Sequence, residues 1–454
     1  MANSYLTFTQ AAGTSRRKFT YSVWMKRSSI DTTGNYNSGF FNCWSDANNR
    51  LAAYFYDNKL YLYGLSGGSA NISVRTNRLF RDTNAWYHIV IAVDTTQSTA
   101  ADRIKFYING VQETSLDQTT YPAQDHDLPS VGVNAKAIEV GRVNFGDQST
   151  YYYMDGYLSH VAFVDGTALT PSSFGQTNST TGQWQFKAPS GVTWGTNGFH
   201  LKFENSGALG TDSSGNTNTF TVQGNLKQSL DTPSNVHATF NPLNKWNHNG
   251  TLRIPAYSNG NLTATYDNAS YNEIAFGNLG VESGKWYWEV KATSVTSTAN
   301  ARIGIGDIQY TNTDPQNTTA TVYYMANGSK KVSGSDTSYG NTYTTGDIIG
   351  VALDMDNRKV YFHKNGTYQN SGDPTSGATG TGAIGLPSGD FIYTIQCEDY
   401  ASSGNRTMDL NTGSGFFGTT AITSAGSNGN GSLFEYDVPS GYYALNTKNI
   451  NTYG

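Results

Sequence analysis

The sequence predicts an all-β protein built from two tandem antiparallel β-sandwiches. Residues 86–112 and 343–368 share one pattern, in which an alternating apolar strand, a polar break and a second alternating strand lead into Asn-Gly. A period of two is typical of a half-buried strand, and Asn-Gly supplies the positive φ angles of tight hairpins. Gly (49) and Tyr (31) are abundant and charged residues make up only 14%, as expected where short strands are joined by turns.

The chain length predicts two domains, because 454 residues exceed what one hydrophobic core usually serves. We expect a first sandwich at residues 1–225, a linker at 226–249 and a second sandwich at 250–454. The linker is placed where the periodicity fails, in a stretch that contains Pro233 and Pro242.

The strands of the first sandwich are predicted where apolar and polar residues alternate. The clearest of these stretches are 19–26, 52–63, 86–94, 104–108 and 158–164. Two later runs, GFHLKF at 198–203 and TFTV at 219–222, indicate strands that return to complete a sheet.

The second sandwich shows the same alternation. Its predicted strands lie at 286–291, 303–305, 349–355, 360–362 and 442–445. Residues 372–389 and 413–431 are rich in Gly, Ser and Thr and are expected to be long surface loops.

Charge and cysteine content narrow the possible functions. The net charge is −5 and the Lys and Arg residues are scattered, so nucleic acid is not expected as a partner. The chain has no run of about 18 apolar residues and no apolar segment before Arg16, so we expect cytoplasmic synthesis without a signal peptide and no membrane insertion. Cys43 and Cys397 fall in different predicted domains and are expected to be buried free thiols, with an interdomain disulfide as the alternative.

Four motifs in the second half resemble the SPRY (B30.2-like) domain. They are GKWYWEVK at 284–291, RIGIGD at 302–307, GDIIGVALDMDNRKVYFHKNG at 346–366 and SGYYALN at 440–446. The resemblance implies a bent β-sandwich that recognises partners through loops on one face and has no catalytic residues.

The first half resembles laminin-G-like domains of the concanavalin A-like jelly-roll class. The motifs are FTYSVWMKR at 19–27, WYHIVIAVD at 86–94, IKFYINGV at 104–111 and MDGYLSHVAFVDGTALTPSSFG at 154–175. Ser159 stands where this class usually has an acidic residue, so a calcium or polar anchoring role is not carried over to that position.

The order of the two domains, with LGTDSSGNTNTFTV at 209–222 and SLDTPSNVHATFNPL at 229–243 between them, resembles structural proteins of tailed bacteriophages, notably those of marine bacteria. The resemblance implies a virion-surface protein made in the host cytoplasm, such as a capsid decoration or appendage, or a tail fibre or spike subunit. Its implied partners are other virion proteins, further copies of itself, and host surface glycans as a candidate ligand. No coiled coil or shaft repeat is found, which favours a compact decoration or short spike.

Concanavalin A-like folds also include glycoside hydrolases, which need two carboxylates close together, so paired acidic residues are the candidates for catalysis. Asp354 and Asp356 precede Asn357 and are expected to form a hairpin turn. Asp125 and Asp127 are expected in an exposed loop, with calcium ligation through oxygen as a weaker alternative. The seven histidines show no zinc-site spacing. We therefore expect no enzyme activity and no cofactor beyond a possible structural calcium ion.

Ligand binding is expected on loops that carry aromatic side chains. The candidate residues are Tyr151, Tyr152, Tyr153, Tyr323 and Tyr324. Aromatic rings next to Asn, Asp and Thr suit sugars, whose C–H faces stack on rings while their hydroxyl groups find polar partners. The alternative is that these rings pack in strands or line a subunit interface.

Three functions remain open from the sequence. A non-enzymatic phage virion surface protein is the first. A cellular carbohydrate-binding lectin or adhesion protein is the second, although such a protein ordinarily has a signal peptide or anchor. A polysaccharide-degrading enzyme is the third, and it lacks a convincing carboxylate pair.

Overall fold

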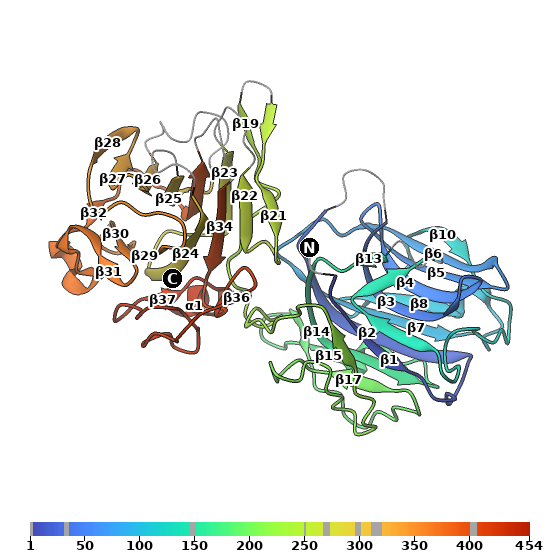
Figure 1. The fold of residues 1–454 in the computed structure, drawn as a ribbon. Coiled ribbons are helices and arrows are strands. Elements are labelled where there is room, and N and C mark those ends of the chain that lie inside the picture. The colour runs from blue at the N-terminus through green and yellow to red at the C-terminus, as the bar shows by residue number, and fades with distance from the viewer. Residues whose placement is uncertain are drawn as a thin grey trace. The chain divides into compact units, whose positions relative to one another are not determined.

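The structure of the protein is a computed structural model in two compact units, residues 1–228 (unit 1) and 229–454 (unit 2). It describes residues 3–30, 36–145, 151–248, 251–266, 273–295, 301–309, 320–399 and 406–454. Strands dominate both units, and the one α-helix among the described residues is α1 (Thr447–Tyr453). The predicted all-β class is confirmed (Figure 1).

Unit 1, drawn in blue to green in Figure 1, has two antiparallel sheets. Sheet A has the order β10-β6-β5-β4-β3-β11-β1-β18, and sheet B the order β17-β14-β2-β7-β8-β9. In sheet A the bounds are β1 (Tyr5–Thr9), β3 (Tyr36–Asp46), β4 (Asn49–Tyr56), β5 (Lys59–Ser66), β6 (Ser69–Leu79), β10 (Leu116–Thr120), β11 (Ala137–Val140) and β18 (Thr221–Gln223). In sheet B they are β2 (Lys18–Arg27), β7 (Trp86–Asp94), β8 (Ile104–Ile108), β9 (Val111–Glu113), β14 (Gly156–Asp165) and β17 (Phe199–Leu201).

The core of unit 1 lies between sheets A and B. Alternate residues of β2 point into it, among them Phe19, Tyr21 and Val23, which are fully buried. Tyr21 stacks on Phe41 of β3 with ring centroids 4.2 Å apart. Apolar contact between the two inner faces therefore holds the sheets together.

Unit 2, drawn in yellow to red, also has two main sheets. Sheet C has the order β21-β22-β34-β24-β29-β30-β31, with β32 beside β30 and β37 beside β24, and sheet D the order β23-β33-β25-β26-β27-β28. In sheet C the bounds are β21 (Ala256–Ser258), β22 (Thr263–Tyr266), β24 (Lys285–Ser294), β29 (Ile348–Asp354), β30 (Lys359–Lys364), β31 (Thr367–Tyr368), β32 (Ile384–Gly385), β34 (Arg406–Asn411) and β37 (Tyr443–Ala444). In sheet D they are β23 (Glu273–Val281), β25 (Ala301–Asp307), β26 (Thr321–Met325), β27 (Ser329–Val332), β28 (Ser335–Ser338) and β33 (Tyr393–Asp399).

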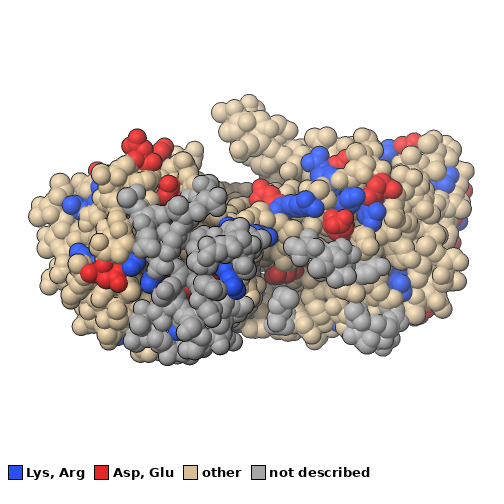
Figure 2. All heavy atoms as spheres, turned by 90° about the horizontal axis from the view of Figure 1, so that it is seen from above, with Lys and Arg blue, Asp and Glu red and all other residues tan. Residues whose placement is uncertain are grey.

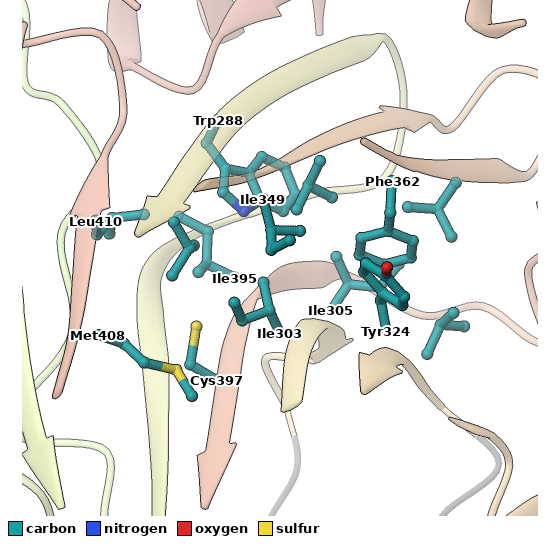
Figure 3. Close-up of a cluster of buried hydrophobic side chains, with 14 of the residues drawn as sticks. Trp288, Ile303, Ile305, Tyr324, Ile349, Phe362, Ile395, Cys397, Met408 and Leu410 are labelled. Atoms are coloured by element: carbon teal, nitrogen blue, oxygen red, sulfur yellow. The ribbon is translucent and has the colours of Figure 1, made fainter. Parts of the chain in front are cut away.

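Side chains from sheets C and D meet in the core of unit 2, which Figure 3 shows in close-up. Trp288, Ile349 and Leu410 come from sheet C, and Ile303 and Ile395 from sheet D. All are fully buried. This is the arrangement expected of a β-sandwich.

Short hairpins and turns complete the described structure. The paired strands are β12 (Arg142–Asn144) with β13 (Tyr151–Tyr153), β15 (Gly175–Thr177) with β16 (Trp184–Phe186), β19 (Trp246–His248) with β20 (Thr251–Arg253), and β35 (Phe416–Phe417) with β36 (Thr420–Ala421). The 3₁₀ turns are η1 (Ala100–Asp102), η2 (Pro171–Ser173), η4 (Gln369–Ser371) and η5 (Pro374–Thr379).

The repeated Asn-Gly pattern forms the same hairpin in both units. Asn109 and Gly110 have φ angles of 48° and 83°, and Asn365 and Gly366 of 47° and 82°. Each Asn makes two 2.8 Å hydrogen bonds with one residue of the preceding strand, which is His88 for Asn109 and Ile348 for Asn365. The Asn N–H donates to the backbone oxygen of that residue, and the Asn Oδ1 accepts its N–H. The tight hairpins predicted from the sequence are confirmed.

The boundary between the units differs from the linker expected at 226–249. It falls after Gln228, and most of the expected linker belongs to unit 2. Ala238 and Phe240 are fully buried in the core of unit 2, and the N–H of Ala238 donates to the oxygen of Leu445 at 3.0 Å. The periodicity fails here because these residues join the core through isolated bridges instead of strands.

Both cysteines are buried and free, which confirms the expected thiols. In the part of the chain that the structure describes, no helix has the length and apolar character needed to cross a bilayer.

Candidate ligand-binding surface

The outer face of sheet A carries a group of aromatic side chains that we call the aromatic surface. Its members are Tyr54, Tyr56, Tyr61, Tyr63, Phe145 and Tyr152. The first four lie on the β4–β5 hairpin, whose alternation places leucine, alanine and phenylalanine in the core and tyrosine outside. Tyr54 and Tyr61 are opposite each other in register, with ring centroids 5.2 Å apart. Tyr56 and Tyr63 flank Tyr61 and are half-exposed.

The β12–β13 hairpin supplies the rest of the aromatic surface. Its alternation directs Val143, Phe145 and Tyr152 toward sheet A, where they join the same cluster. Phe145 packs edge-on against Tyr54 at 4.8 Å and against Tyr152 at 5.4 Å. Edge-to-face contacts of this kind hold the rings in fixed orientations.

Polar side chains border the aromatic surface along β6 and β10. The hydroxyl of Tyr61 donates to Oε1 of Gln118 at 2.8 Å, and Ser73 donates to the same oxygen at 2.5 Å. Arg75 lies two residues after Ser73 on β6. Its guanidinium carbon is 5.2 Å from the ring centroid of Tyr56 and 5.6 Å from that of Tyr61. Rings and hydrogen-bonding groups therefore lie side by side on one face.

The other side of the β12–β13 hairpin holds a stacked arginine. The guanidinium carbon of Arg142 lies 3.4 Å from the ring centroid of Tyr5 and 4.4 Å from that of Tyr151, and its Nη2 donates to Glu139. The pKa of Arg142 is raised although burial alone lowers it, because the Glu139 carboxylate favours the charged form. This cation is already balanced by one carboxylate.

The predicted tyrosine candidates separate into two groups. Tyr151, Tyr152 and Tyr153 form strand β13, where all three are half-buried, so they lie on a strand and not on the expected loop. Tyr152 belongs to the aromatic surface and Tyr151 stacks on Arg142. Their role in binding stays a prediction.

Tyr323 and Tyr324 do not lie on a loop, and this correction removes them from any accessible surface. Both are in strand β26 and fully buried. Tyr324 points into the core, where it packs against Phe362 (Figure 3). It also contacts the ring of Tyr343. Burial raises the pKa of both phenols. Sheet D is covered on both faces here, so a strand with adjacent tyrosines exposes neither.

Asp125 and Asp127, the weak calcium candidates, share a cation that the chain supplies itself. Arg17 Nη1 lies 3.2 Å from Asp125 Oδ1, and Arg17 Nε lies 2.7 Å from Asp127 Oδ1. The Arg17 cation thus balances one of the two carboxylate charges that calcium would neutralise. Among the described residues, no group of three or more His, Cys, Asp or Glu side chains is arranged to hold a metal ion.

Asp354 and Asp356 form the predicted turn. Asp354 is fully buried, pairs with Lys285 at 3.0 Å and accepts the N–H of Asn357 at 2.9 Å. Asp356 accepts the N–H of Gly284 at 2.8 Å. Both carboxylates therefore have structural partners at the end of the β29–β30 hairpin.

A buried Ser22 and His88 pair resembles half of a catalytic triad but has the wrong proton arrangement. Trp184 Nε1 donates to His88 Nδ1 at 2.9 Å, so in the neutral ring the proton is on Nε2, which faces Ser22 Oγ at 2.8 Å. Burial lowers the pKa of His88 to about 3. An imidazole that donates to the serine is not its general base.

Glu289 on β24 is a buried carboxyl group whose pKa is strongly raised. It is fully buried, and it accepts hydrogen bonds from the N–H groups of Glu435 and Tyr436, both at 2.9 Å, from Tyr287 at 3.0 Å and from Asn411 at 3.3 Å. Burial raises its pKa to about 7, against the effect of these donors. The carboxyl group anchors the C-terminal segment to the outer face of sheet C.

The described charged side chains on one face of the molecule form no large area of a single sign (Figure 2). On the face drawn in Figure 2, Lys and Arg side chains are interspersed with Asp and Glu. This distribution does not favour a polyanion such as nucleic acid.

Comparison with known families identifies the two domain classes. Residues 1–173 match the model of the concanavalin A-like lectin/glucanases superfamily, and residues 285–383 match that of the SPRY domain. The chain therefore contains a concanavalin A-like domain followed by a SPRY domain. These classes suggest a carbohydrate-binding or adhesion-like module.

Similar solved structures include the SPRY domain of human HERC1, with 18% identity over 38% of this chain and 96% of that chain and a TM-score of 0.29. A heptameric SAP-like pentraxin from Limulus polyphemus has 15% identity over 49% of this chain and 89% of that chain, with a TM-score of 0.30. Domain 4 of AbnA, a GH43 extracellular arabinanase from Geobacillus stearothermophilus, in complex with arabinotriose, has 21% identity over 34% of this chain and 64% of that chain, with a TM-score of 0.25. A search of curated proteins found no match.

Proposed function

We propose that this chain is a non-enzymatic carbohydrate-binding protein whose aromatic surface on unit 1 recognises glycans. The observation that carries the proposal is the hairpin β4–β5, which presents half-exposed Tyr56 and Tyr63 on either side of Tyr61. Sugar rings stack their C–H faces on such side chains, and Ser73 and Gln118 lie within the same surface to bond hydroxyl groups. The concanavalin A-like class of this domain supports the proposal.

A glycan array probed with the full chain tests this function. We expect the double variant Tyr56→Ala/Tyr63→Ala to lose binding at least about tenfold, because each stacked ring contributes on the order of 1 kcal/mol. The control is Tyr453→Ala, which removes an exposed ring of α1 in unit 2. Equal binding by the double variant and the wild type, at equal melting temperature, would refute the role of the aromatic surface.

We further propose that the protein acts on the surface of a tailed-phage virion, as a capsid decoration, appendage, fibre or spike subunit that assembles with other virion proteins. The support is the order of the two domain classes and the segments at 209–222 and 229–243, which resemble those of phage structural proteins. Antibodies against this chain should label intact phage particles in a lysate of cells that express it. Labelling of the host cell envelope instead would favour the lectin or adhesion alternative.

A further inference from the structure

We propose that the aromatic surface selects acidic glycans, with Arg75 as the group that binds a sugar carboxylate. This inference rests on the proposed glycan-binding function and adds to it the class of ligand. It depends on three observations. These are the position of the Arg75 guanidinium, the excess of positive over negative side chains around it, and the polar groups beside it.

Arg75 is held in place by an aromatic and an acidic contact. Its guanidinium lies against the rings of Tyr56 and Tyr61, at 5.2 and 5.6 Å from their centroids. Its Nε donates to Asp117 Oδ1 at 2.7 Å. Because a guanidinium is planar and rigid, fixing the Nε side also fixes the direction of the opposite edge, formed by Nη1 and Nη2. That edge is directed away from Asp117.

The terminal edge of Arg75 is free to bind an anion. Asp117 is the one hydrogen-bond partner of this guanidinium among the residues that the structure describes. The Arg75 side chain is 17% exposed, so it is largely recessed and remains partly accessible to solvent. Two parallel N–H groups match the two oxygens of a carboxylate, and a partly desolvated ion pair is stronger than an exposed one.

The local charges favour an acidic ligand. Lys59 Nζ lies 2.6 Å from Asp117 Oδ2, so Lys59 and Arg75 share one carboxylate and one positive charge is left over. Arg142, on the other side of the β12–β13 hairpin, pairs one to one with Glu139. Burial raises the pKa of Asp117, but hydrogen bonds from the two cations lower it more, so Asp117 stays charged. Two positive side chains, Lys59 and Arg75, therefore face one negative carboxylate.

A hydrogen-bonding group beside the cation suits the hydroxyl groups of the same sugar. Gln118 lies opposite Arg75 in the register of β6 and β10. Its Oε1 already accepts from Tyr61 and Ser73, so its amide N–H groups are the part of the side chain left for a ligand. An acidic sugar ring that stacks on Tyr56 thus meets a guanidinium and an amide at one edge.

The test compares three polysaccharides on the full chain by biolayer interferometry: polygalacturonate, neutral dextran and dextran sulfate. We expect polygalacturonate to bind at least about tenfold more tightly than dextran at low salt, with the difference shrinking as salt is added. Arg75→Gln should remove this preference, so that the ratio of polygalacturonate to dextran affinity falls to about one. Arg75→Lys should restore only part of it, because lysine keeps the charge and loses the fork.

Arg78→Gln is the matched control, since Arg78 lies on the same strand, is more exposed and pairs with Glu113 away from the rings. Loss of the acidic preference in this variant as well would overturn the assignment to Arg75. Equal binding of polygalacturonate and dextran, both dependent on Tyr56 and Tyr63, would overturn the acidic specificity while the proposed function stands. Tightest binding to dextran sulfate would overturn the carboxylate specificity and show that negative charge alone is recognised. Binding to none of the three polysaccharides would overturn both the acidic specificity and the proposed glycan-binding function.

Discussion

Replacing Glu289 with glutamine is expected to remove a pH dependence from the stability of unit 2. The folded protein raises the pKa of this carboxyl from its ordinary value of 4.5 to about 7, mainly through burial. Between these two values the folded state binds the proton and the unfolded state does not, so the free energy of unfolding falls as pH rises. The interval corresponds to about 3 kcal/mol, at roughly 1.4 kcal/mol per pH unit.

The sign follows from the direction of the pKa change. A raised pKa in the folded state gives stability that is complete below pH 4.5 and is lost as pH rises through about 7. We therefore expect the difference in unfolding free energy between wild type and Glu289→Gln to decrease by about 3 kcal/mol from about pH 4 to about pH 8. A constant offset, caused by the amide group facing four donors, cancels in this comparison.

The assay is a urea titration of the full chain, read by pulsed peroxide oxidation of methionine. Met408 is fully buried in the core of unit 2 and reports its unfolding, while Met25 reports unit 1 as an internal reference. Glu282→Gln, an exposed site in unit 2, is the control and should give a difference that does not change with pH. The reasoning is refuted if the Glu289→Gln difference is equally flat.

Three further predictions concern packing and chemistry. Tyr324→Ala should destabilise unit 2 by about 3–5 kcal/mol in the same assay, because it empties a fully buried ring position; a change below about 1 kcal/mol would argue against its burial. Gly110→Ala should lower the melting temperature of unit 1, because its φ is 83° and the added Cβ would lie 2.6 Å from Trp184. Incubation with bacterial polysaccharides should release no reducing ends, and Asp354→Asn should change stability alone, since Asp354 is committed to Lys285; turnover lost in that variant would show an enzyme.

The sequence predicted the fold better than the site, because strand periodicity is local and exposure is not. Adjacent Tyr323 and Tyr324 predict one inward and one outward ring, but both are buried, because whether a sheet is covered on its second face depends on segments far away in the chain. The run YFYDNKLYLY at 54–63 carried a clearer signal, since tyrosine at alternate positions of both strands marks one aromatic face. The alternation of this run predicts strands, but the tyrosines on its outer side were not among the predicted site residues.

The contacts of Arg75 could not be predicted from the sequence. Asp117 is 42 residues away, and its place beside Arg75 depends on the pairing of β6 with β10, which contains a register shift between Leu116 and Gln118. A shift of one residue reverses the faces of a strand, so periodicity alone does not fix such a partner. The same limit applies to Glu289, whose backbone donors lie 146 and 147 residues away.

The matching Asn-Gly hairpins of the two units have a consequence for chemical ageing. Asparagine followed by glycine is prone to deamidation, because a glycine nitrogen without a neighbouring Cβ can attack the side-chain amide. The amide oxygens of Asn109 and Asn365 each accept a 2.8 Å hydrogen bond from a backbone N–H of the neighbouring strand, His88 on β7 and Ile348 on β29, so ring closure requires this strand contact to open first. The extent of deamidation in stored protein therefore reports how often each of these strand contacts opens. Because Asn109 is in unit 1 and Asn365 in unit 2, the masses of the two peptides that contain them report on each unit separately.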